Sequence, residues 1–208
     1  MKQVTIGKAV VDIHDGPLGI TLSGGVDSSL LLYILMQHAT DTIHAYTLAT
    51  VEKNRTEATV AATVIGRCID LTGHNRVIQH TQFVDRKSNG GLNDRAKDDF
   101  RNKKINMIYA ADTALYSDDV AKTFKYDSEM YGERNPNVIR SVYSPGGKCH
   151  LPFFNIHKQD IRDIYIELGI RDTLFPLTRS CDSLTLLEGH CGDCWACEER
   201  FWGFGSYS

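Results

Sequence analysis

Residues 21–36 read TLSGGVDSSLLLYILM, and the interpretation of the whole sequence starts from this stretch. A β-prone apolar run at 18–22 leads into it, and a nearly continuous apolar segment follows its small polar residues. This order predicts a buried strand at 18–22, a tight loop, and a helix over 28–38 that packs against a sheet. In open parallel sheets, ligands bind at such strand-to-helix junctions.

The loop has the composition of an anion-binding site. Gly24 and Gly25 carry no side chains, so backbone N–H groups can close around a phosphate. Ser23 and Ser28 add hydroxyl donors, and the N-terminus of the helix adds partial positive charge. Asp27 would repel a bare phosphate, which favours a role as helix cap, as ligand of Mg²⁺ or as a structural residue under the loop. The spacing is neither that of a Walker loop nor that of the dinucleotide fingerprint.

Apolar, β-prone segments alternate with helical patterns along the rest of the chain. Further strands are expected at 43–48, 76–80, 121–126 and 150–154, and further helices at 55–71, 104–115 and 158–168, with a polar loop over 85–99. Strands that alternate with helices predict an α/β fold, Rossmann-like, with a parallel sheet of about five strands flanked by helices.

Composition and charge narrow the possible environments and partners. The chain has 208 residues and a formal net charge of −3, so it lacks the broad basic field that dominates nucleic-acid binding. A nucleic acid is therefore not expected as a direct partner. Residues 1–8 lack an apolar signal core, and no run reaches the roughly 20 apolar residues of a membrane span, so we expect no membrane association and a cytoplasmic location.

Four of the six cysteines crowd the C-terminal end of the sequence: Cys181, Cys191, Cys194 and Cys197. In a reducing compartment, such spacing favours a metal site over disulfides. Four thiolates suit tetrahedral Zn²⁺ in a closed structural site. The short spacers also resemble iron–sulfur ligation, His190 could replace one ligand, and cysteines without metal remain an alternative.

The loop also carries a resemblance to a known superfamily. Residues Ser23-Gly24-Gly25-Val26-Asp27-Ser28 resemble the PP-loop of the ATP pyrophosphatases, which are adenylating enzymes related to GMP synthetase and NAD synthetase. The resemblance implies an adenine nucleotide alpha hydrolase-like version of the predicted fold. It also implies that residues 23–28 hold the pyrophosphate end of ATP while a substrate oxygen attacks the α-phosphate.

Together, the loop and the cysteine cluster resemble the 7-cyano-7-deazaguanine synthase family. Further elements of that family are matched in chain order by Arg101-Asn102, Pro152, Lys158, Leu168-Gly169-Ile170, Leu177-Thr178, Ser180-Cys181 and Arg200. The resemblance implies an ATP-dependent carbon–nitrogen ligase that converts 7-carboxy-7-deazaguanine and ammonia into 7-cyano-7-deazaguanine. Asp27 and Lys158 are then expected to be catalytic, Arg101 to join the loop in binding ATP, and Mg²⁺ and Zn²⁺ to be bound.

The expected domain organisation follows from the positions of these motifs. Residues 1–178 form an ATP-binding α/β domain, and residues 179–208 form a small zinc-binding segment packed on it. The aromatic residues of FWGFGSYS, 201–208, could fold back on the core or bury in a partner, so a homodimer is possible.

The middle of the chain leaves the substrate open. The family's tyrosine-glycine-glutamine element is replaced by Ala49-Thr50-Val51-Glu52, and residues 125–140 do not align with the family. Alternatives are a related adenylating enzyme acting on another acid, a tRNA sulfur transferase, and a nucleotide- or zinc-binding module without catalysis. The net charge and the use of four cysteines as metal ligands disfavour the sulfur transferase. Sequence alone leaves open whether the product serves tRNA or DNA modification.

Overall fold

The structure is a computed structural model that describes residues 1–50, 56–84, 94–115, 138–183 and 188–208. Its centre is a five-stranded sheet in the order β5-β4-β3-β6-β7. The strands are β3 (Leu18–Thr21), β4 (Ile43–Thr50), β5 (Val77–Val84), β6 (Met107–Tyr109) and β7 (Cys149–His150), and each neighbouring pair is parallel. The α/β class and the parallel sheet predicted from the sequence are confirmed.

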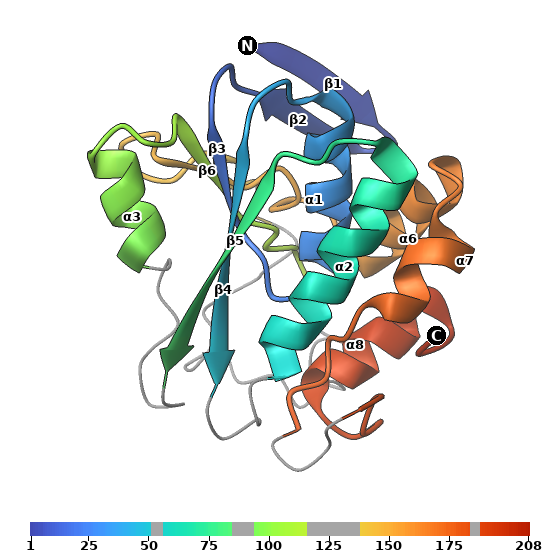
Figure 1. The fold of residues 1–208 in the computed structure, drawn as a ribbon. Coiled ribbons are helices and arrows are strands. Elements are labelled where there is room, and N and C mark those ends of the chain that lie inside the picture. Colours follow the sequence, from blue (N-terminus) through green and yellow to red (C-terminus); the bar gives the residue numbers. More distant parts are fainter. Residues whose placement is uncertain (51–55, 85–93, 116–137, 184–187) are drawn as a thin grey trace.

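The connections between strands create a switch point beside β3. The chain moves outward from β3 through α1 (Val26–His38) to β4, and through α2 (Thr56–Thr72) to β5. It then returns by way of α3 (Asp94–Arg101) to β6, on the other side of β3. Because crossovers between parallel strands are right-handed, this reversal puts α3 on the opposite face from α1 and α2, as Figure 1 shows. The loop after β3 therefore lies where open sheets bind ligands.

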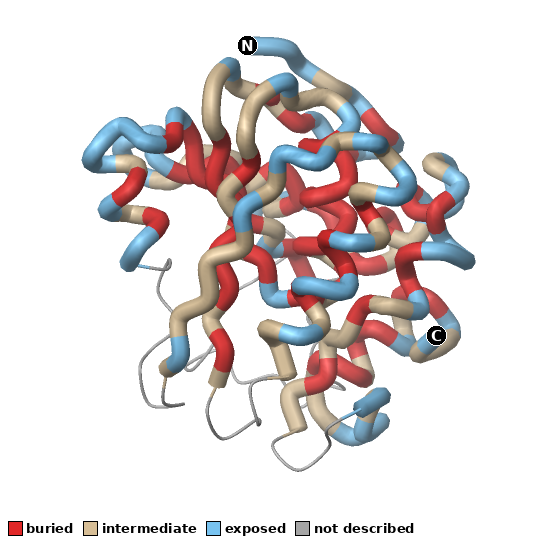
Figure 2. The backbone as a smooth tube through the Cα atoms, in the orientation of Figure 1, coloured by how far each residue is buried: buried red, intermediate tan, exposed pale blue. Residues whose placement is uncertain are grey.

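Helix α1 lies at the centre of the core, which explains why its sequence is apolar on nearly every face. Its residues from Ser28 to Met36 are all buried, and Figure 2 shows buried backbone running through the middle of the molecule. Helix α2 is instead amphipathic, and its inner face buries Ala61, Val64, Ile65 and Cys68.

Three sequence expectations are wrong for the segments that precede β6 or follow it. The segment 104–115 is not a helix, because Met107–Tyr109 form β6, buried between β3 and β7. The helix lies earlier, at 94–101, so the polar loop expected over 85–99 is wrong from residue 94 onward, while residues 85–93 lie outside the described part of the chain. Ion pairs one turn apart, such as Lys97 with Asp94, support this helix. The strand expected at 150–154 is only the two-residue β7. The strand expected at 121–126 lies outside the described residues.

An antiparallel hairpin that the sequence did not predict covers one end of the core. It consists of β1 (Lys2–Ile6) and β2 (Ala9–Ile13) and buries Ala9, Val11 and Ile13. Backbone N–H of Asp12 donates to Nε2 of His150 on β7 at 3.1 Å, which joins the hairpin to the edge of the sheet.

The C-terminal part of the chain is helical and packs on the sheet domain. It contains α6 (Lys158–Glu167), α7 (Arg171–Leu174), the 3₁₀-helix η2 (Phe175–Leu177) and α8 (Trp195–Phe204). Phe204 stacks on Phe175 with ring centroids 4.3 Å apart, and both side chains belong to the main hydrophobic core. Residues 179–208 thus share a core with the rest of the chain. None of the helices in the described ranges is long and apolar enough to cross a lipid bilayer.

Candidate active site

The loop between β3 and α1 depends on a glycine with left-handed backbone geometry. Gly24 has φ +78°, and a Cβ at this position would lie 2.6 Å from Cγ1 of Val60 on α2. Both the backbone conformation and the close packing therefore require glycine. Helix α1 has no side-chain hydrogen bond at its N-cap, Gly25. The N-terminal end of α1, with its partial positive charge, therefore lies beside the loop.

Hydroxyl groups hold this loop in shape. The Oγ atoms of Ser23 and Ser28 lie 3.1 Å apart, and Ser28 and Ser29 both donate to the carbonyl oxygen of Gly25, at 3.3 and 2.7 Å. The predicted binding residues 23–28 thus form one hydrogen-bonded turn between β3 and α1.

The two residues expected to be catalytic meet at the start of α1. Lys158, the first residue of α6, donates from Nζ to Oδ2 of Asp27 at 2.5 Å, although 131 positions separate them in the sequence. A third side chain, Glu199 of α8, places Oε2 3.3 Å from the same Nζ. Lys158 and Glu199 are each only 4% exposed. Two carboxylate partners hold the buried side chain of Lys158 in a fixed position.

The Asp27 carboxylate also fits a cation. Its Oδ1 is buried and accepts no hydrogen bond from any described residue. The cluster of Lys158, Asp27 and Glu199 carries one formal positive and two negative charges, so a divalent ion would offset the excess. Carboxylate oxygen is a preferred ligand of Mg²⁺. In the structure Asp27 pairs with Lys158 through Oδ2, and its Oδ1 is chemically suited to a cation.

Gly203 on α8 allows Lys158 to reach this position. A Cβ at Gly203 would lie 2.4 Å from Cγ and 2.7 Å from Cβ of Lys158. Neither atom is at the flexible end of the lysine side chain, so α8 and α6 could not stay in register with any larger residue. The sequence gave no sign of this close approach.

Gly203→Ala is therefore expected to destabilise the fold by about 1–3 kcal/mol through overpacking. The matched control is Gly66→Ala on α2, where a Cβ would meet no atom within 4 Å. That change should stabilise the helix by about 0.5–1 kcal/mol, because alanine favours helix over glycine. Urea denaturation of both variants measures the difference. Equal gains in stability at the two positions would show that α8 does not pack against Lys158 as described.

Residues 178–180 connect the C-terminal helix to the loop. Backbone N–H of Arg179 donates to the carbonyl oxygen of Gly24 at 2.9 Å, and N–H of Val26 donates to Oγ of Ser180 at 3.4 Å. The guanidinium of Arg200 donates to Oγ1 of Thr178 at 2.9 Å and to Oγ of Ser180 at 3.4 Å. Arg200 is fully buried, and burial lowers its pKa to about 10, so it remains charged at neutral pH.

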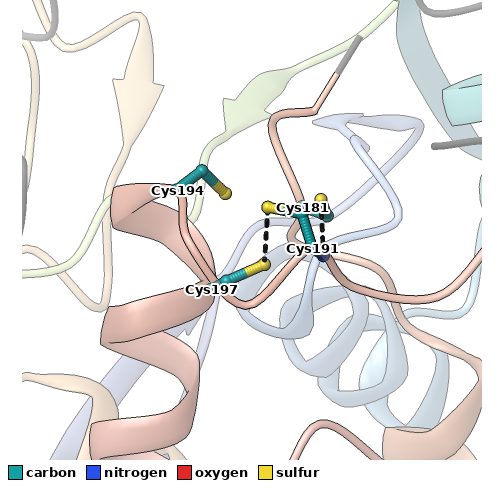
Figure 3. Close-up of side chains that lie close together, drawn as sticks. All are labelled: Cys181, Cys191, Cys194 and Cys197. Carbon is teal, nitrogen blue, oxygen red and sulfur yellow. Dashed lines mark hydrogen bonds between the residues drawn. The ribbon is translucent and has the colours of Figure 1, made fainter. Parts of the chain in front are cut away.

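The four predicted cysteine ligands form one cluster, shown in Figure 3. The Sγ atoms of Cys181, Cys191, Cys194 and Cys197 all lie within 4.8 Å of one another. Backbone N–H groups of Cys191 and Ser183 both donate to Sγ of Cys181 at 3.4 Å. Desolvation raises the pKa of the Cys191 thiol, but N–H groups of Asp193 and Cys194 donate to its sulfur and bring the pKa down to about 7.

This geometry fits one tetrahedral metal ion. Zn–S bonds of about 2.3 Å place the four sulfurs of a zinc site about 3.8 Å apart, which the cluster allows. In a cubic iron–sulfur cluster each thiolate binds a different iron, which requires wider spacing. His190 is not one of the ligands, because its Nε2 accepts from N–H of Ser180 at 3.4 Å and its ring stacks on Tyr207.

The structure does not bring Arg101 to the loop. Arg101 ends α3, on the opposite face of the sheet from α1, and its guanidinium pairs with Asp98 at 2.6 Å with the side chain 73% exposed. It borders a separate cavity of about 370 Å³ next to Cys149. Burial raises the pKa of Cys149 to about 12, so this thiol stays neutral at physiological pH.

The sequence did not predict the two residues that position Lys158. Glu199 pairs with its ammonium group, and Gly203 leaves room for its side chain. Both lie next to the recognised cysteine motif, but neither is unusual in type. Their role depends on α8 crossing α6 beside the loop, and no local pattern in the sequence carries that information.

Comparison with known proteins adds a family match for the N-terminal part. Residues 8–86 match the family model of asparagine synthase, a PP-loop ATP pyrophosphatase domain. The matched range contains β3, the loop and α1, and it continues through β4 and α2 to the end of β5. No match was found among curated protein sequences.

Two solved structures are similar at low sequence identity. The U34-tRNA thiolase NcsA from Methanococcus maripaludis, with its 4Fe–4S cluster, has 17% identity and a TM-score of 0.44; the alignment covers 76% of this chain and 59% of the thiolase. NMN synthetase from Francisella tularensis has 13% identity and a TM-score of 0.46, and the alignment covers 89% of this chain and 76% of the synthetase. Residues 8–86, which contain the loop after β3, are thus similar to the asparagine synthase family of PP-loop domains.

Proposed function

We propose that this protein is an ATP-dependent ligase that converts 7-carboxy-7-deazaguanine and ammonia into 7-cyano-7-deazaguanine. The observation that carries the proposal is that the two motifs behind the family resemblance form one site. The loop at 23–28 and the cysteine segment at 181–197 are far apart in sequence. In the structure, Ser180 hydrogen-bonds to Val26, and Glu199 shares Lys158 with Asp27.

The reaction needs activation because a carboxylate oxygen is a poor leaving group. The substrate carboxylate attacks the α-phosphorus of ATP, the bond to the bridging oxygen breaks, and pyrophosphate leaves. Ammonia then attacks the carboxyl carbon, AMP departs and a proton is lost, which gives the amide. A second ATP activates the amide oxygen in the same way, and loss of AMP and a proton gives the nitrile. Such chemistry depends mainly on positioning and on stabilising phosphate charge.

The described residues divide these tasks among themselves. The N–H groups of the loop and of the first turn of α1 bind phosphate oxygens, as helix N-termini commonly do. Lys158, held by Glu199, directs its ammonium toward the same end of α1 and offsets negative charge on the departing pyrophosphate. Oδ1 of Asp27 would hold Mg²⁺, which when bound neutralises phosphate charge.

We assign a structural role to zinc at the cysteine cluster. Four thiolates close the coordination shell and leave no position for substrate. Cys197 lies two residues before Glu199 and three before Arg200, so a metal at the cluster fixes the part of α8 that contacts Lys158 and Ser180. The metal thereby supports the active site without taking part in the chemistry.

Mass spectrometry of the products tests this proposal. Purified protein is incubated with ATP, Mg²⁺, ammonia and a panel of 7-deazaguanine acids and unrelated carboxylic acids. We expect AMP and pyrophosphate to form only with the deazaguanine acid, and the nitrile to appear after the amide. AMP formation with a different acid would support an adenylating activity but reject this substrate. If no acid leads to ATP cleavage, the assignment as an enzyme is rejected.

A further inference from the structure

We propose that the cavity between the first turn of α2 and the C-terminal segment binds the acid substrate, as a planar ring with a carboxylate at one end. This inference rests on the proposed function and adds the place and the chemistry of substrate recognition. The cavity has a volume of about 610 Å³, and its lining residues come from α2, from 176–179, from 188–190 and from the tail at 207–208. Sites for small ligands are commonly about 300–1,000 Å³.

The cavity lies directly beside the phosphate-binding loop. Val60, which lines it, is the residue that leaves no room for a side chain at Gly24. Arg179, which also lines it, hydrogen-bonds through its backbone N–H to the carbonyl oxygen of Gly24 at 2.9 Å. Two wall residues thus contact the loop itself. A ligand in the cavity is therefore next to the end of ATP that the loop would hold.

One end of the cavity suits a carboxylate. The Arg179 guanidinium is fixed at two points, since Nε donates to the carbonyl oxygen of Gly189 at 2.9 Å and Nη1 donates to Oγ1 of Thr56 at 3.1 Å. Guanidinium groups bind carboxylates with directional, charge-assisted hydrogen bonds. The N-terminus of α2, which begins at Thr56 in the same wall, adds partial positive charge.

The other lining groups suit a flat, guanine-like ring. His190 and Tyr207 stack with ring centroids 5.4 Å apart and planes inclined by 18°, so a further planar ring could extend the stack. Glu188 stands exposed at the rim of the cavity. Its carboxylate can accept hydrogen bonds from the N–H-rich edge of a guanine-type ring. Arg179 and Glu188 thus give the cavity one cationic and one anionic group, which suit the carboxylate and the N–H groups of a carboxy-deazaguanine.

A cavity-filling substitution tests this site. Thr59 is exposed on α2 and lines the cavity, so Thr59→Trp should fill the space without disturbing the core. The matched control is Thr63→Trp, one turn further along the same exposed face and outside the cavity. Isothermal titration calorimetry measures binding of 7-carboxy-7-deazaguanine and, separately, of ATP with Mg²⁺. We expect Thr59→Trp to weaken acid binding at least about 30-fold and to leave ATP binding within about threefold, and Thr63→Trp to change neither.

A second pair of measurements isolates the carboxylate contact. Arg179→Gln should weaken binding of the acid about 10-fold or more. It should leave binding of 7-deazaguanine, which lacks the carboxylate, unchanged, and this unchanged value also shows that the cavity is intact.

The outcomes separate this inference from the proposed function. If Thr59→Trp binds the acid as tightly as the wild type, or if it loses ATP binding to the same extent, the cavity is not the acid site, although the ligase activity can still stand. If the wild type binds the acid and the variants behave as expected, but ATP is never consumed, the proposed function fails and the site remains. If the wild type binds no deazaguanine acid, both are rejected.

Discussion

Asp27→Asn is expected to lower the rate of pyrophosphate formation by roughly 100- to 1,000-fold, the loss seen when one preorganised charge-stabilising group is removed from an active site. The substitution keeps the size of the side chain but removes its charge. Lys158 would lose its partner at 2.5 Å, and the buried Oδ1, which fits Mg²⁺, would no longer be part of a carboxylate. The loss should appear mainly in kcat, because the group acts on charge that develops as pyrophosphate departs.

The rate is measured as pyrophosphate released per enzyme at saturating ATP and acid. Asp70→Asn serves as the control, because Asp70 is exposed on α2 and its ion pair with Arg67 is long, at 3.9 Å. It should retain full activity. A thermal melt of Asp27→Asn close to that of the wild type would confirm that the loss is chemical. An Asp27→Asn enzyme that keeps more than about a third of the wild-type rate would reject the assignment of the loop as the ATP site.

Cys194→Ser is expected to lose the bound metal and to lower Tm by about 10 °C or more. Binding of a structural metal contributes folding free energy, and 1 kcal/mol changes Tm by about 2–4 °C in a domain of this size. Cys194 is also the N-cap residue of α8. Without its bond to the metal, the start of the helix that carries Glu199 and Arg200 is no longer anchored. Activity should therefore fall together with stability, although no cysteine of the cluster touches the substrate.

Elemental analysis and calorimetry of the purified variant measure both effects. Cys68→Ala is the control, since Cys68 is a buried thiol on α2 outside the cluster; it should keep its metal. Zinc without absorbance near about 400 nm is expected in the wild type, because iron–sulfur clusters absorb there and zinc thiolates do not. Full metal content in Cys194→Ser would show that this thiol is not a ligand.

The sequence predicted those features that short segments specify by themselves. The strand at 18–22, the glycine loop and the apolar helix after it form one contiguous pattern, and all three are present. The four cysteines could be grouped by spacing alone, because few residues separate three of them, and the structure places all four sulfurs together.

The segment before β6 shows where local patterns fail. An apolar run such as 104–115 has no periodicity that separates a helix from a buried strand. Its three strand residues are extended because β3 and β7 lie on either side and supply hydrogen-bond partners. Helix α3 could not be predicted because its sequence is polar. It buries only Ala96 and Asp99, so it lacks the apolar stripe by which a helix is recognised in a sequence. Arg101, at its end, was expected at the ATP site only by family resemblance.

The sequence by itself determined the glycine loop and the grouping of the four cysteines, because each depends on residue type and spacing within a short segment. Only the tertiary structure decided that the two belong to one site. Lys158 meets Asp27 because α6 begins beside the first turn of α1, and it is held there because Glu199 and Gly203 fall on the one face of α8 that crosses it. Such contacts depend on how helices pack around a common core, and that packing is set by the whole chain rather than by any segment.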